Sequence, residues 1–543
     1  MVCMSFRFRV FVHNFKLLNI EDVGENVGEN VGENVGEDVG EDVGEIFVAI
    51  NNYIWQKKTL LCGKRNKTGF GLCGKRNKMG FGLCGERNNL LYLPKIKRFM
   101  ETKIFKRKIY SKISEWKSKS NGKSALLIEG PRRVGKSTIV KIFAQKEYES
   151  HIIIDFNRVS EDVKNLFNDL TNLDFIFLAL QTFYHVTLHE RKSVIVFDEV
   201  QKCPNARQAI KYLVEDGRYD YIETGSLISI KQNTQGITIP SEEESLEMHP
   251  MDFEEFLWAL EDNVTVVMLK KIWEEKRPLG ILHRQLMRDF RLYMLVGGMP
   301  QAVEEYINTN NFSQVDRVKR RILKLYEDDF LKIDPTGRIS KMFLAIPGQL
   351  NRKAISYSTT SVIGKQNDIS LLQLIKGLED SKTVNVVYHC DDPNIAMPLM
   401  SDERKFKMYL ADTGLFVTLA FWDKDITENI IYEKLLSDKL SANLGYLYEN
   451  IVAQMLVANG HRLFYYTWRY DDKHFYEIDF LISEGSKICP IEVKSSAITS
   501  HKSIDEFSKK FSSRISKEYI ICPKDYKKEG IIYLVPPYEV PFL

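Results

Sequence analysis

Four residues at fixed spacing give the first indication of chemistry in this 543-residue chain. They lie in the segment GPRRVGKST, which matches the pattern G-x-x-x-x-G-K-[ST]. Glycines let backbone N–H groups close around phosphate, the lysine reaches the β- and γ-phosphates, and the hydroxyl holds Mg²⁺. The segment therefore predicts ATP and Mg²⁺ as cofactors, bound by Gly130, Pro131, Arg132, Arg133, Val134, Gly135, Lys136, Ser137 and Thr138.

A second group of polar residues follows the apolar run SVIVF in the segment SVIVFDEV, residues 193–200. A buried strand that ends in two acids is the Walker B arrangement. We expect Asp198 to hold Mg²⁺ together with Ser137, and Glu199 to polarise the attacking water. A surface acid pair after a buried strand is the alternative.

A third group ends the short strand expected at YIET, residues 221–224. Thr224 and Ser226 could contact the γ-phosphate or the lytic water, which would make them catalytic with Lys136 and Glu199. A plain Ser/Thr turn explains the same residues equally well.

A separate set of charged residues lies near the C-terminus. The segments YEIDFLIS and ICPIEVKSS read as paired strands that carry Asp479, Glu492 and Lys494, after a helix that carries Glu449. Glu492 and Lys494 are two residues apart, so they share a strand face. Acids and a lysine in this order are the signature of the PD-(D/E)xK nuclease fold, in which the acids would share a metal ion and the lysine would orient water. A half-buried strand shows the same alternation.

The surrounding elements suit the first site. SALLIE, residues 124–129, predicts a buried parallel strand, and TIVKIFAQ, residues 138–145, predicts a helix whose N-terminus faces the phosphates. A chance glycine-rich turn would not require this strand, loop and helix order.

Several motifs resemble the AAA-type ATPases of archaea and bacteria that carry an uncharacterised C-terminal domain. They are GPRRVGKST, VFDEVQ, ETGSLISI, LEMHPMDFEEFL, YMLVGGMPQAV and FKMYLADTGLF. The resemblance covers nearly all of the chain from Met100 onward. It implies an α/β P-loop NTPase core of AAA type followed by a helical lid, and a C-terminal domain similar to restriction endonucleases.

The expected domains follow from these segments. Residues 100–245 form the P-loop core and 246–335 the helical lid. A winged-helix-like module occupies 336–430, in which residues 346–351, 355–366 and 370–381 suggest helix, turn, helix, and residues 383–390 suggest a wing strand. The module could bind DNA, and packing between domains is an equally good role for it. Residues 431–543 form the nuclease-like α/β domain. Residues 1–99 contain two short tandem repeats, V-G-E-[ND] and LCGKRNKxGFG. They are expected to be disordered or not native, with a natural start at Met100.

Composition narrows the class of protein. Eight cysteines without C-x-x-C spacing argue against a disulfide framework or zinc site and indicate a reducing cytoplasm. The N-terminus is a poor signal peptide, and no apolar run is long enough to span a membrane, so no membrane partner is expected.

The main hypothesis is an ATPase whose nucleotide cycle controls a C-terminal module that handles DNA or RNA. The alternatives are an ATP-gated metal-dependent nuclease and a nucleotide-dependent switch or scaffold that does not hydrolyse ATP. A homo-oligomer would suit either enzyme. Three residues could supply an arginine finger, and surface salt bridges are the plainer role for each: Arg288, Arg291 and Arg321.

Overall fold

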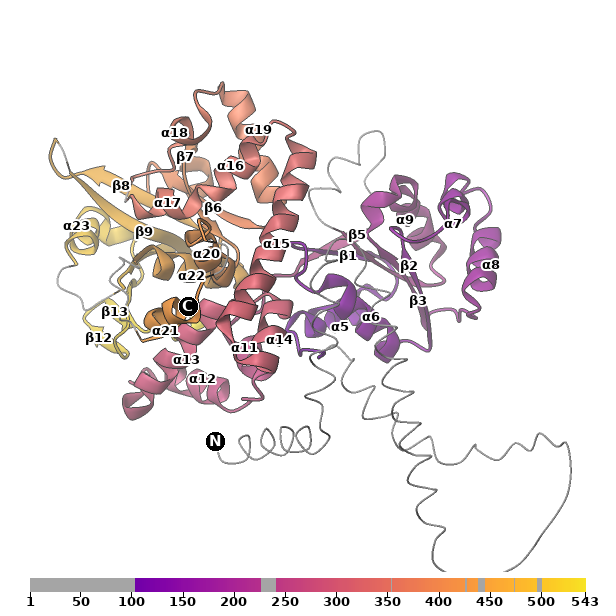
Figure 1. Ribbon diagram of the computed structural model, residues 1–543, viewed down its shortest axis with the longest axis horizontal. Helices are drawn as coiled ribbons and strands as arrows, with labels where there is room; N and C mark the ends of the chain where they lie inside the picture. The colour runs from indigo at the N-terminus through magenta and orange to yellow at the C-terminus, as the bar shows by residue number, and fades with distance from the viewer. Residues whose placement is uncertain are drawn as a thin grey trace, which may run out of the picture. The chain divides into compact units, whose positions relative to one another are not determined.

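The computed structural model describes residues 103–225, 241–352, 354–424, 427–437, 445–472, 474–495 and 501–543. The N-terminal repeats, the start expected at Met100 and Ser226 lie outside these residues. The described chain contains two sheets and the helices that cover them (Figure 1).

The first sheet is parallel throughout and follows the order β2-β3-β4-β1-β5. Its strands are β1 (Ala125–Glu129), β2 (Ser150–Asp155), β3 (Ser193–Asp198), β4 (Asp220–Thr224) and β5 (Glu243–Glu247). The helices of this part of the chain are α5 (Ile109–Ser120), α6 (Lys136–Glu147), α7 (Glu161–Asn165), α8 (Leu173–Tyr184) and α9 (Pro204–Asp216). The α/β core with a parallel sheet expected from the sequence is confirmed.

Both faces of this sheet are buried, which explains its continuous apolar strands. Along β3, Val194 and Val196 pack with α5 and α6, whereas Ile195 and Phe197 pack with α8 and α9. Because successive side chains point to opposite faces, one apolar run fills two cores. The polar residues that follow each strand are therefore left at the sheet edge.

Helices fill the next segment: α11 (Phe253–Ala259), α12 (Thr265–Glu275), α13 (His283–Val296), α14 (Pro300–Thr309) and α15 (Phe312–Ile333). Asp252 begins α11 with a capping box that Glu255 completes. The sequence predicts a helical lid here, and the segment is helical. The buried residues of these helices belong to one cluster with residues as far as Val540.

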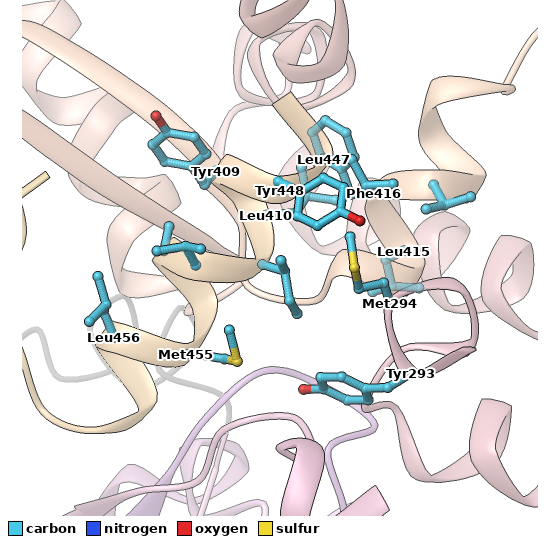
Figure 2. Close-up of a cluster of buried hydrophobic side chains, with 14 of the residues drawn as sticks. Tyr293, Met294, Tyr409, Leu410, Leu415, Phe416, Leu447, Tyr448, Met455 and Leu456 are labelled. Carbon is cyan, nitrogen blue, oxygen red and sulfur yellow. The ribbon is translucent and has the colours of Figure 1, made fainter. Parts of the chain in front are cut away.

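Figure 2 shows part of this shared cluster, where side chains from distant parts of the sequence meet. Tyr293 and Met294 come from α13, while Met455 and Leu456 come from a helix about 160 residues later in the chain. This cluster of buried residues extends across the boundaries expected near residues 335 and 430.

The turn at Gly298 lies in close contact with other backbone segments within this core. Gly298 N–H donates to Asp412 Oδ2 at 2.6 Å, and Met251 N–H donates to the Gly298 carbonyl at 2.7 Å. A Cβ on Gly298 would lie 2.1 Å from the Met251 carbonyl oxygen, and one on Gly414 would lie 2.5 Å from Gly297 Cα. Only glycine allows these backbones to approach so closely.

The second sheet is mixed and has the order β12-β13-β11-β10-β9-β8-β6-β7. Its strands are β6 (Val384–Cys390), β7 (Ser401–Leu410), β8 (Phe464–Arg469), β9 (Phe475–Glu484), β10 (Lys487–Val493), β11 (Glu518–Ile521), β12 (Lys527–Glu529) and β13 (Ile532–Val535). The helices around it are α16 (Arg338–Leu344), α17 (Ile346–Asn351), α18 (Thr359–Ile363), α19 (Asp368–Asp380), α20 (Thr413–Ala420), α21 (Asn429–Leu436), α22 (Gly445–Ala458) and α23 (Lys502–Phe511).

The separate winged-helix module expected at 336–430 is not what the structure contains. The expected helices and wing strand are present as α17, α19 and β6, and the segment between the two helices contains the short helix α18. However, β6 pairs in parallel with β8 and antiparallel with β7, so both β6 and β7 belong to the C-terminal sheet. The wing strand is therefore an internal strand of a larger domain, because its partner lies far along the chain.

Candidate functional site

The loop between β1 and α6 has the backbone that a phosphate-binding loop requires. Gly130 has φ +147° and Gly135 has φ +106°, in the range that favours glycine. A Cβ on Gly130 would also lie 2.3 Å from the Met248 carbonyl oxygen. Arg133 adopts φ +69°, which is uncommon for a residue with a side chain. The loop is thus tightly curled before α6 begins at Lys136.

Lys136 is buried inside this curl. Its Nζ donates to the carbonyl oxygens of Gly130 at 2.8 Å and Pro131 at 3.1 Å. Burial lowers the pKa of Lys136 to about 8, although nearby Glu199 and Asp198 oppose this change. The loop's own carbonyls hold the ammonium group at the place where phosphate oxygens are expected.

Three adjacent strands bring the next polar residues together. Ser137 Oγ donates to Asp198 Oδ1 at 2.7 Å, and Thr224 Oγ1 donates to the same carboxylate oxygen. Ser137 lies in the segment after β1, Asp198 ends β3, and Thr224 ends β4. In the sheet, β4 lies between β1 and β3. A hydroxyl and a carboxylate in contact beside a phosphate-binding loop are suitable ligands for Mg²⁺.

Glu199 is held beside this group. It adopts φ +56°, its N–H lies 3.4 Å from Thr224 Oγ1, and Gln201 Nε2 donates to its Oε2 at 2.5 Å. Glu199 therefore has a fixed orientation, which an acid that polarises water requires. The role of Gln201 was not predicted, although its position two residues after Glu199 was visible in the motif VFDEVQ.

The first site opens into a cavity of about 550 Å³. Six residues of the predicted loop line this cavity: Arg132, Arg133, Gly135, Lys136, Ser137 and Thr138. Among the described residues, Gly130, Pro131 and Val134 do not belong to this lining. Glu199 also lines the cavity. Its lining also includes residues that the sequence did not indicate, among them Phe105, Asn157, Pro300, Asp329 and Lys332.

Arg132 has a defined partner outside the loop. Its Nη1 donates to Asp329 Oδ1 at 3.1 Å and to Oδ2 at 3.2 Å, and Tyr326 Oη donates to its carbonyl at 3.1 Å. Asp329 and Tyr326 both belong to α15. No local pattern links α15 to the loop, because the two segments are nearly 200 residues apart.

The C-terminal residues also converge. Glu449, Asp479, Glu492 and Lys494 all line the smaller cavity, of about 340 Å³. Lys494 pairs with Glu492, Asp479 Oδ2 accepts from Val493 N–H at 2.7 Å, and Glu449 Oε2 accepts from Tyr409 Oη at 3.3 Å. The predicted placement is thus observed for Glu449 on α22, Asp479 on β9 and Glu492 on β10. Lys494, which was expected on the second strand, follows the end of β10 at Val493.

Two further residues alter the chemistry of this cavity. Lys407 and Glu477, which the sequence did not indicate, form an ion pair there. Burial opposes the charge on Lys407, but Glu477, Glu449 and Asp479 outweigh it and raise its pKa. Burial, with Glu449 and Glu477 nearby, raises the pKa of Asp479 well above its usual value.

The predicted metal cluster is not evident at this cavity. Within the described ranges, no group of three or more His, Cys, Asp or Glu residues is arranged to hold a metal ion. The Lys407 ammonium already lies among the acids, where it offsets part of their charge. The arrangement brings acids and lysines together without the geometry of a formed metal site.

The candidate arginine fingers lie elsewhere. Arg291 Nε donates to Tyr448 Oη at 3.4 Å. Neither it nor Arg288 or Arg321 lines the larger cavity in the part of the chain that the structure describes. Among the same residues, no helix is long and apolar enough to cross a membrane.

Comparisons with known proteins divide the chain in three. Residues 122–257 match an AAA domain, residues 287–426 match a domain of unknown function (DUF8612), and residues 444–538 match another (DUF4143). No curated protein matches the chain.

Solved structures show weaker likenesses. The Walker-type ATPase of Pyrococcus abyssi is 17% identical over 58% of this chain and 96% of its own, with a TM-score of 0.35. The Orc1 protein of Aeropyrum pernix in complex with DNA is 11% identical over 62% and 93%, with a TM-score of 0.24. RuvB of Thermotoga maritima is 12% identical over 52% and 89%, with a TM-score of 0.23. Values this low add no argument. Residues 122–257 are thus similar to an AAA domain, and the parallel sheet and the curled loop of this segment agree with that match.

Proposed function

We propose that the protein is a Mg²⁺-dependent ATPase whose nucleotide cycle controls its C-terminal module. One observation carries the proposal: Ser137, Asp198 and Thr224 meet at one sheet edge beside the buried Lys136. Ser137 and Asp198 would hold Mg²⁺, which when bound offsets phosphate charge. In this arrangement Lys136 would exchange its carbonyl partners for phosphate oxygens.

The remaining residues serve hydrolysis. Glu199 would accept a hydrogen bond from the attacking water and polarise it, while Gln201 holds the carboxylate in place. Thr224 links Glu199 to Asp198, so it would keep the water and the phosphates in register. Ser226 stays a prediction.

Phosphate release by the full chain tests this assignment, with and without DNA. Lys136→Ala should abolish ATP binding, because the buried cation that meets the phosphates is lost. Glu199→Gln should bind ATP without turning it over. Glu215→Gln, an exposed acid on α9, is the matched control and should behave as wild type. Equal turnover in wild type and Glu199→Gln would remove Glu199 from its role, and binding without turnover in wild type would favour a switch or scaffold.

A second candidate is an ATP-gated nuclease. The observation in its favour is that Glu449, Asp479, Glu492 and Lys494 line one cavity, with nearby carboxylates that disfavour one another's charge. A divalent cation would relieve this repulsion. Because Lys407 partly does so already, a binding module for DNA or RNA is the plainer role.

Cleavage of DNA and RNA with Mg²⁺ or Mn²⁺ tests the second candidate. Asp479→Ala and Lys494→Ala should abolish cleavage, whereas Asp472→Asn, an exposed acid after β8, should not. If wild type cleaves none of a varied set of substrates, the cavity has no nuclease role. We also propose that the protein forms a homo-oligomer, which sedimentation with and without ATP would test. We further propose a cytoplasmic location.

A further inference from the structure

Helix α15 holds the phosphate-binding loop at two points. Asp329 binds the Arg132 side chain, and the Tyr326 hydroxyl binds the Arg132 carbonyl. The two residues are three apart, so they lie on one face of the helix. The contact involves both the backbone and the side chain of a single loop residue, which makes the position of the loop depend on α15.

The carboxylate of Asp329 lies in an unexpected place for a nucleotide site. It lines the same cavity as Lys136 and Ser137, where the phosphates are expected. Its charge is offset by Arg132 and by Lys332, whose Nζ lies 2.7 Å from Oδ1. An arriving triphosphate brings more negative charge to the same cavity and offers the guanidinium a second oxyanion of matching geometry.

The two ends of α15 differ in how firmly they are held. At its beginning, Asp316 is fully buried and accepts from Thr418 Oγ1 at 2.7 Å and Tyr432 Oη at 2.8 Å. Near its end, the side chains of Arg132 and Asp329 in their ion pair are 40% and 19% exposed, so this pair is partly open to solvent. Exposed ion pairs are weak and exchange readily, whereas buried networks do not. The ion pair between Arg132 and Asp329 is therefore the contact that a ligand can break.

From these contacts, and resting on the proposed ATP binding, we propose that Asp329 is a positioning residue that competes with the triphosphate for Arg132. Without nucleotide, Asp329 holds Arg132 and keeps the loop on α15. When ATP binds, Arg132 turns to the phosphates and α15 is released from one of its two contacts with the loop. Because Asp316 ties the other end to α20 and α21, the release would reach the C-terminal module.

The first test compares ATP and ADP affinities of the full chain by calorimetry. Asp329→Asn should tighten ATP binding about two- to five-fold, the range expected for removing an exposed ion pair. The gain for ADP should be smaller, because ADP presents one phosphate fewer. Asp329→Glu should restore wild-type selectivity. Asp328→Asn, the exposed neighbouring acid, is the matched control and should change neither affinity.

A second pair of variants separates competition from simple loosening. Tyr326→Phe weakens the hold of α15 on the loop but keeps the competing carboxylate, so the ATP to ADP preference should stay as in wild type. Arg132→Gln removes the exchanged group, so it should lower that preference, and adding Asp329→Asn should then have no further effect. A helix peptide spanning 321–333 should also exchange its amide hydrogens faster in the presence of ATP.

Each outcome decides the matter. Equal effects of Asp329→Asn on ATP and ADP, weaker ATP binding, or an equal effect of Asp328→Asn would overturn the proposal. An undiminished effect of Asp329→Asn in the Arg132→Gln background would do the same. If wild type binds ATP and these variants are silent, only this inference fails. If wild type binds no ATP, the proposed function fails with it.

Discussion

Lys136 should take up a proton when ATP binds at alkaline pH. Burial lowers its pKa to about 8, so at pH 9 roughly one tenth of the nucleotide-free protein carries the charge. Phosphate oxygens beside the amine favour the charged form and should raise the pKa above 10. Binding at pH 9 should therefore take up about 0.9 proton per ATP, and binding at pH 8 about 0.5.

Calorimetry in buffers of different ionisation enthalpy measures this uptake, because the slope of the binding enthalpy against the buffer enthalpy is the number of protons. Lys136→Arg keeps a cation that stays charged at pH 9, so any retained binding should occur without uptake. Lys141→Met, which removes an exposed lysine from the same helix, should leave the slope unchanged. A wild-type slope near zero at pH 9 would refute the reasoning.

The same burial predicts how stability depends on pH without nucleotide. The unfolded chain keeps a proton on this lysine up to pH about 10.5, whereas the folded chain releases it near pH 8. Since the unfolded state binds more protons across that interval, the free energy of unfolding should rise with pH by up to about 3 kcal/mol. Urea unfolding of wild type and Lys136→Met should show this rise in wild type alone. Parallel curves for the two proteins would contradict it.

Three further predictions concern other groups. Glu199→Gln should slow phosphate release about 10²- to 10⁴-fold while calorimetry shows unchanged ATP affinity, and loss of affinity would mean that the residue binds nucleotide instead. Asp412→Ala should lower the free energy of unfolding in urea by about 2 to 4 kcal/mol, because the buried N–H groups of Gly298 and Leu415 lose their acceptor; an unmoved midpoint would disprove this. Burial raises the pKa of Glu539 to about 8, so the folded state keeps a proton that the unfolded state has lost above pH about 4.5. The free energy of unfolding should therefore fall as pH rises through that interval, and Glu539→Gln should remove this fall. Thermal melts at pH 5 and pH 8 measure the difference, and an equal change in wild type and variant would contradict the prediction.

The local parts of the nucleotide site could be predicted because their causes are local. A glycine-rich loop between an apolar run and a helical run already specifies a strand, a curled loop and a helix N-terminus. Asp198 and Thr224 end two other apolar strands, and the carboxyl ends of parallel strands share one edge of the sheet. Strand order still had to come from the structure, since pairing depends on contacts between distant segments.

The C-terminal part shows the limit of the same reasoning. The segments that form β6 and α19 were recognised, but β6 pairs with β8 across more than 70 residues and so joins the larger sheet. Alternation of apolar and polar residues indicates that a strand has one buried face, but it does not indicate which strand lies beside it. The sequence therefore predicted a module of its own for a strand that in the structure belongs to the C-terminal sheet.

By itself, the sequence determined a phosphate-binding loop, the acids that follow a neighbouring strand, and a set of acidic and basic residues on C-terminal strands. Only the tertiary structure placed Asp329 in the nucleotide cavity, and Lys407 and Glu477 among the C-terminal acids. The physical reason is that the type and spacing of neighbouring residues fix local backbone conformation, whereas a charge's partner is fixed by packing between segments that lie far apart in the chain.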